Sequence, residues 1–142
     1  MAIRFREPTL ADAEMILGWR SKPRVTDYMN TDIDADPVGQ RVWLERCHER
    51  ADYYHWIVEI GRVPAGLVYV DRLDLDALQT PWGFYIGDDQ FLNMGGLIPP
   101  YLYNWIFFQV GLEQVWAEVL SFNSDVIALH YQHGYTFERL AE

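Results

Sequence analysis

The chain has 142 residues, of which 50% are hydrophobic and 15% aromatic, so residues 1–142 are expected to form a single domain around a dense core. Its 21 acidic and 11 basic residues give a formal net charge of −10, which repels phosphate backbones and argues against a nucleic-acid partner. The same charge gives mild support to a cationic small-molecule ligand.

The N-terminal half reads as a strand followed by two helices. Residues 3–6 form a short strand pattern, without the basic start and apolar stretch of a signal peptide. Thr9 can cap a helix over residues 9–20, and Asp36-Pro37 can begin a second helix over residues 36–50. The segment between the two helices is expected to be a loop.

Cys47 is the only cysteine, so no intramolecular disulfide can form and a reducing compartment is indicated. The neighbouring His48 raises a Cys-His nucleophile as one reading. Adjacent helical residues point in different directions, however, and could not easily share a proton. A buried structural cysteine is therefore the preferred interpretation.

The middle of the chain is rich in strand patterns. Residues 55–60 and 65–71 are predicted to form a hairpin around Gly61, and residues 82–86 form a further apolar strand. The loop at residues 90–96 follows, with a Gly-Gly pair and with Asn93, a residue that tolerates positive φ. Such a loop before a helix can direct backbone N–H groups at a phosphate, although an ordinary strand-to-helix turn fits the same residues.

A long aromatic helix is expected over residues 101–110. Pro99-Pro100 precede it, so the helix is predicted to begin late or to kink. The surrounding apolar segment, residues 97–112, is too short to span a bilayer. We therefore expect a cytoplasmic protein without a membrane partner.

Residues 115–120 alternate as a strand that Glu118 interrupts. A carboxylate at this position either reaches solvent where strands splay apart, or is held in a cleft with a raised pKa, as a general base for an ammonium group requires. Asn123 then caps a helix that runs to His133, and Gly134 ends it. His130 and His133 share a helix face, but no third ligand with suitable spacing is evident in the sequence. We therefore predict no metal site. The order of elements indicates an α/β (α+β) fold with a mixed, largely antiparallel sheet flanked by helices.

These segments resemble the GNAT superfamily of acyl-CoA N-acyltransferases over nearly the whole chain. In its pyrophosphate motif, Gln90 and Gly95 match the family pattern, whereas Asn93 replaces the first glycine. Residues 118–123, with Leu129, Gly134 and Tyr135, are similar to the signature E-V-L-x-x-N … L … G-[FY]. Residues 4–6, 9–13 and 19–21 are similar to the opening strand and first helix of the family.

The resemblance implies an N-acetyltransferase in which an amine attacks acetyl-CoA directly in a ternary complex. It implies Glu118 as the general base, and His130 or, as second choice, Tyr131 as the group that protonates the leaving thiolate. The residues expected to bind acetyl-CoA are Phe84, Tyr85, Ile86, Gln90, Asn93, Met94, Gly95, Gly96 and Asn123. Those expected to contact the acceptor are Tyr28, Met29 and Trp82.

Within the superfamily, the chain looks most like the branch of UDP-amino-sugar N-acetyltransferases of pseudaminic acid biosynthesis and ribosomal-protein N-terminal acetyltransferases. An amino sugar or amino-sugar nucleotide is the expected acceptor, and a protein N-terminal amine is the alternative.

In addition to Asn93, two further features depart from the family pattern. His130 takes the place of a common tyrosine, and only eight residues follow Gly134, where the family adds a strand or hairpin over the acceptor site. This shortened C-terminus predicts an open cleft or a strand supplied by a partner, for which a homodimer is one arrangement. The same three features favour the rival hypothesis of a noncatalytic acyl-CoA-binding module.

Overall fold

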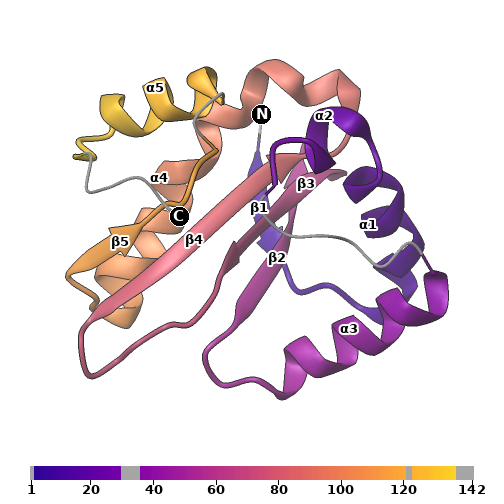
Figure 1. Cartoon of the computed structure of the whole chain (residues 1–142), viewed down its shortest axis with the longest axis horizontal. Helices are drawn as coiled ribbons and strands as arrows, with labels where there is room; N and C mark the ends of the chain where they lie inside the picture. The colour runs from indigo at the N-terminus through magenta and orange to yellow at the C-terminus, as the bar shows by residue number, and fades with distance from the viewer. Residues whose placement is uncertain (1, 30–35, 121–122, 137–142) are drawn as a thin grey trace.

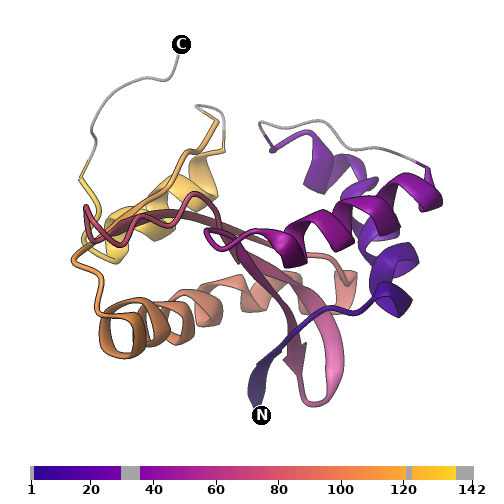
Figure 2. The same ribbon diagram turned by 90° about the horizontal axis from the view of Figure 1, so that it is seen from below.

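Five strands form one sheet in the order β1-β2-β3-β4-β5, with helices on both faces (Figures 1 and 2). The computed structural model describes residues 2–29, 36–120 and 123–136. The strands are β1 (Ile3–Arg6), β2 (Tyr54–Ile60), β3 (Val63–Val70), β4 (Gln79–Ile86) and β5 (Gln114–Trp116). Strands β1 to β4 pair antiparallel and β5 is parallel to β4, which confirms the mixed, largely antiparallel sheet.

Eight helical segments surround the sheet in the described part of the chain. They are η1 (Leu10–Asp12), α1 (Ala13–Arg20), α2 (Pro23–Thr26), α3 (Pro37–Glu49), η2 (Asp89–Leu97), α4 (Ile98–Tyr103), η3 (Asn104–Val110) and α5 (Ser124–Gln132). Asp36 caps α3 by accepting a hydrogen bond from the Val38 N–H, as the sequence predicts. The short helix α2, which begins at Pro23, was not predicted.

A tight hairpin joins β2 to β3. Ile60 and Val63 pair across it, and the two residues between them, Gly61 and Arg62, have φ of 57° and 69°. Two consecutive residues with positive φ are typical of a type I′ turn, whose twist matches that of the strands. The predicted hairpin around Gly61 is therefore confirmed.

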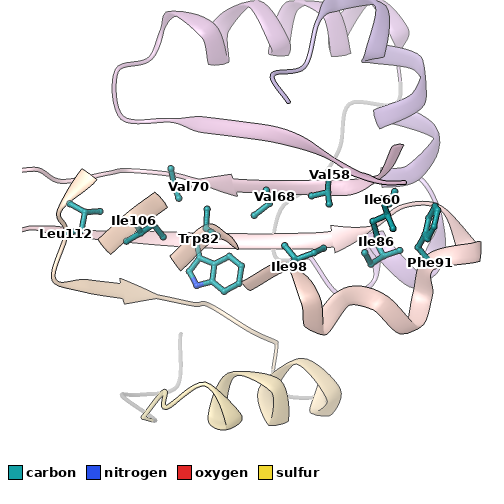
Figure 3. Close-up of a cluster of buried hydrophobic side chains, with 12 residues drawn as sticks. Val58, Ile60, Val68, Val70, Trp82, Ile86, Phe91, Ile98, Ile106 and Leu112 are labelled. Atoms are coloured by element: carbon teal, nitrogen blue, oxygen red, sulfur yellow. The ribbon is translucent and has the colours of Figure 1, made fainter. Parts of the chain in front are cut away.

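Side chains alternate between two cores on opposite faces of the sheet. On one face, Ile57, Leu67 and Tyr85 pack with buried residues of α1 and α3. On the other, Val58, Val68 and Ile86 belong to a larger cluster that α4 and η3 complete (Figure 3). The period of two along each strand gives both faces apolar side chains, so the sheet is covered on both sides.

The helix after η2 begins at Ile98 and includes both prolines, so the start expected at residue 101 was too late. Pro99 and Pro100 lie in the first turn of α4, where a missing N–H costs nothing. The segment continues into η3 with π-helical geometry and ends at Gly111, whose φ is 84°. No helix within the described ranges is long and apolar enough to cross a membrane.

Candidate functional site

Strands β4 and β5 separate shortly after they meet. They pair only from Gln79 opposite Gln114 to Pro81 opposite Trp116. From Trp82 to Ile86, β4 pairs with β3 on one edge, and no described strand pairs with its other edge. The expected strand over residues 115–120 is therefore wrong beyond Trp116, because an alternating pattern forms no ladder without a partner strand. Backbone groups at this edge have no strand partner, although the Ile86 carbonyl accepts a hydrogen bond from Arg24.

A cavity of about 970 Å³ lies on the sheet face that carries α1 and α3. Met29, Trp82, Tyr85 and Glu118, all singled out from the sequence, are among its lining residues. Tyr28 is 43% exposed and does not line it. Candidate acceptor-binding and catalytic positions from distant parts of the chain thus meet at one cavity.

Glu118 lies just beyond the end of β5, on the cavity wall. Its side chain is 53% exposed, and its Oε1 lies 3.5 Å from Nη2 of Arg72. The carboxylate reaches solvent where the strands diverge, which is the first of the two environments considered for this position. It is accessible to an amine bound in the cavity.

The loop at residues 90–96 forms η2, which begins directly after β4. The Asp88 carboxylate caps it by accepting from the Gln90 N–H (3.0 Å) and from the Gln90 side chain (3.1 Å). Asn93 is not among the described residues with positive φ, so its tolerance of positive φ is not used here: it lies within the helical segment η2. Met94 packs on the larger core, and a Cβ added at Gly95 would lie 3.4 Å from Phe84.

Two basic residues that the sequence interpretation missed connect α2 to the end of β4. Arg24 donates to the Ile86 carbonyl (2.6 Å) and the Gly87 carbonyl (2.9 Å), and both Arg24 and Lys22 pair with Asp89. These cations lower the pKa of the Asp89 carboxyl. They neutralise an acidic residue beside η2, where an anionic ligand would otherwise meet repulsion.

His130 on α5 is buried against the ring of Trp82, at a centroid distance of 5.5 Å, and against Tyr135, at 4.7 Å. Burial, with a smaller contribution from His133, lowers the pKa of His130 to about 4. The ring is therefore neutral near pH 7, and the expected role as a charged proton donor does not fit this environment. Tyr131, the next residue on α5, is 52% exposed.

Asn123 occupies the N-cap position of α5, although its side chain makes no capping hydrogen bond within the described residues. Gly134 follows the helix with a φ of 86°, as expected for its end. A Cβ added at Gly96 would lie 3.7 Å from Leu129, so α5 packs beside η2.

A partly buried hydroxyl network near β4 was also missed in the sequence interpretation. The Tyr135 hydroxyl accepts from Nε1 of Trp82 (2.6 Å) and from the Tyr103 hydroxyl (2.9 Å). These residues are far apart in sequence and look like ordinary core aromatics. The only sequence signal for Tyr135 was the Gly134-Tyr135 pair of the family signature.

The acetyltransferase (GNAT) domain family matches residues 2–136 of the chain. No curated protein matches it significantly.

Several solved structures share the fold. A domain from Methanocaldococcus jannaschii is 19% identical, with a TM-score of 0.80, and the match covers 99% of this chain and 92% of that one. Campylobacter jejuni N-acetyltransferase PseH, in complex with acetyl coenzyme A, is 14% identical, with a TM-score of 0.79 and coverage of 99% and 93%. Vibrio cholerae spermidine N-acetyltransferase, in complex with CoA and spermine, is 14% identical, with a TM-score of 0.82 and coverage of 96% and 82%.

Proposed function

Because the chain belongs to the GNAT family of acetyl-CoA-dependent N-acetyltransferases, we propose that it acetylates the primary amine of an amino sugar or an amino-sugar nucleotide. The observation that carries the proposal is the position of Glu118, on the wall of a cavity that reaches the edge where β4 and β5 separate. A base, an acceptor cavity and a free strand edge are the parts that direct acetyl transfer requires.

The free edge of β4 from Trp82 to Ile86 fits the cofactor. An extended ligand with amide groups can hydrogen-bond to an unpaired strand edge as an added strand would. At the end of β4, the backbone of η2 around Asn93, Gly95 and Gly96 fits the pyrophosphate, because glycine lets the backbone approach an anion closely.

Glu118, directly or through a water, accepts a proton from the acceptor ammonium. The neutral amine nitrogen then attacks the thioester carbonyl carbon and a C–N bond forms. The C–S bond breaks with its electrons leaving on sulfur, and the nitrogen loses its second proton to water to give the amide. Backbone N–H groups of β4 around Phe84, Tyr85 and Ile86 stabilise the negative charge on the carbonyl oxygen. No covalent acyl-enzyme is needed, since both reactants are held together.

His130 remains the residue that we assign to the departing thiolate, because it packs against Trp82 at the start of the free edge. As a neutral ring it acts by donating an N–H hydrogen bond, and the sulfur takes its proton from the surrounding water. The exposed hydroxyl of Tyr131 is the second candidate.

The proposal is tested by measuring CoA release from acetyl-CoA with three acceptors at equal concentration: a UDP-linked amino sugar, a peptide with a free N-terminus, and spermine. Turnover with the amino-sugar nucleotide at least tenfold above the other two is expected. A preference for the peptide would move the acceptor assignment to protein N-termini. Binding of acetyl-CoA without turnover of any amine would contradict the proposed acceptor class.

A further inference from the structure

The cavity next to Glu118 has a charge opposite to that of the chain as a whole. Its lining includes the charged residues Arg20, Arg46, Arg50, Arg72, Asp71 and Glu118. The described walls therefore carry a formal net charge of +2, in a chain whose net charge is −10. The acidity that mildly favoured a cationic ligand does not extend to this site.

The two carboxylates of the lining are already engaged by arginines. Asp71 accepts from Nη2 of Arg50 at 2.6 Å, and Glu118 lies 3.5 Å from Nη2 of Arg72. Arg46 makes no ion pair within the described part of the chain. Its charge lines the cavity, and no carboxylate of the described residues forms an ion pair with it.

Helix α3 presents these groups along one face. Trp43, Arg46 and Arg50 follow one another at helical spacings of three and four, and all three line the cavity. Arg50 is engaged by Asp52 (2.9 Å) and Asp71, whereas Arg46, the other guanidinium group on this wall, has no ion-pair partner among the described residues. Guanidinium groups recognise phosphates through parallel N–H donors.

We propose that the acceptor amine is carried by a molecule with a phosphate or diphosphate, which Arg46, supported by Arg50, binds on the α3 wall of the cavity. The inference rests on the proposed acetyl transfer at the same site. A volume of about 970 Å³ is at the upper end of ligand pockets and accommodates a nucleotide-sized acceptor. Trp43, which is 36% exposed, offers an aromatic surface one turn away for a base.

Calorimetric titration with UDP in saturating CoA tests the inference, because CoA fills the pyrophosphate site at η2. Uridine, inorganic pyrophosphate and spermine are titrated in parallel. Binding of UDP to the wild type is expected, with a dissociation constant raised at least tenfold in Arg46→Gln. Equal affinity for pyrophosphate would identify the phosphates alone as the recognised group, whereas tighter UDP binding would add a contact to the nucleoside.

Arg41→Gln is the matched control, since Arg41 lies on α3, faces Glu14 at 3.9 Å and does not line the cavity. It should bind UDP as the wild type does. Failure of UDP to bind, equal UDP affinity in Arg46→Gln and wild type, or tighter binding of spermine than of UDP would each overturn the inference. Acetyl-CoA binding, titrated separately, distinguishes these outcomes from failure of the acetyltransferase proposal, which would show as loss of acetyl-CoA binding in the wild type.

Discussion

The carboxylate of Glu118 and the guanidinium of Arg72 lie 3.5 Å apart in the lining of one cavity, although they are 46 positions apart in the chain. Arg72 follows β3 with a φ of 55°, and Glu118 follows β5. The two strand ends thus bring the candidate base and an arginine to the same wall. This pair orients the carboxylate that we propose as the base for the acceptor amine.

Glu118→Gln should lower kcat for amine acetylation by about 10²- to 10⁴-fold, because the amide cannot accept the ammonium proton. The dissociation constant for acetyl-CoA, measured by calorimetry, should stay within twofold of the wild type. Glu113→Gln is the control, since Glu113 is exposed, precedes β5 and lies outside the cavity lining. A Glu118→Gln enzyme with wild-type kcat would exclude Glu118 as the base.

Gly95→Val should raise the dissociation constant for acetyl-CoA at least tenfold. The new Cβ would be in van der Waals contact with Phe84 (3.4 Å) and Ile86 (3.7 Å), so the two methyl groups of valine would crowd these side chains and the adjoining η2 backbone. Gly18→Val is the matched control, because a Cβ at Gly18 meets no atom within 4 Å. Similar acetyl-CoA affinities for the two variants would contradict a binding role for this part of η2.

Acid should destabilise the fold through two buried histidines. Burial lowers the pKa of His55 and that of His130 to about 4, below the value of about 6.5 expected in the unfolded chain. Between these two pH values the unfolded state binds the extra protons, so the free energy of unfolding falls as pH falls. The loss is about 1.4 kcal/mol per pH unit for each histidine and is absent above pH of about 6.5. Urea titrations from pH 7.5 to 4.5 measure it.

His55→Phe should remove the contribution of His55 to this slope. Neither nitrogen of His55 has a hydrogen-bond partner within the described residues, and its ring packs against Trp43 and Tyr53. The variant should also gain about 1–3 kcal/mol at pH 7, because an unsatisfied polar group leaves the core. His48→Gln, at an exposed position, should keep nearly the wild-type slope. An unchanged slope in His55→Phe would refute the assignment.

Cys47 should react slowly with thiol reagents in the native protein. It is 5% exposed, and burial raises the pKa of its thiol to about 11. At pH 8 the thiolate fraction is then about two orders of magnitude below that of a cysteine with a pKa of about 8.5. Reaction with iodoacetamide, followed by mass spectrometry with and without urea, measures the ratio. Comparable rates in the two states would mean that the thiol is accessible.

The local patterns identified most elements of the fold from the sequence. The start of α3 at Asp36-Pro37 and the β2–β3 turn at Gly61 could be predicted, because caps and positive-φ turns depend on residues adjacent in sequence. The strand over residues 115–120 was overextended, because the end of β5 depends on where β4 stops pairing with it. Local alternation carries no information about a partner strand.

Some features of the candidate site could likewise be predicted from local sequence, and others could not. The motif residues Gln90, Gly95 and Glu118 could be recognised because their spacing is local, and the family match covers the residues 2–136 in which they lie. The arginines that reverse the charge of the cavity stand at positions 20, 46, 50 and 72, and only the packing of α1 and α3 on β3 brings them together. The burial that keeps His130 neutral also comes from Trp82 and Tyr135. By itself, the sequence determined the family, the order of elements and the residues of the motifs. The exposure and electrostatic environment of each site residue were decided by the tertiary structure, because they depend on contacts between strands and helices that are far apart in the sequence.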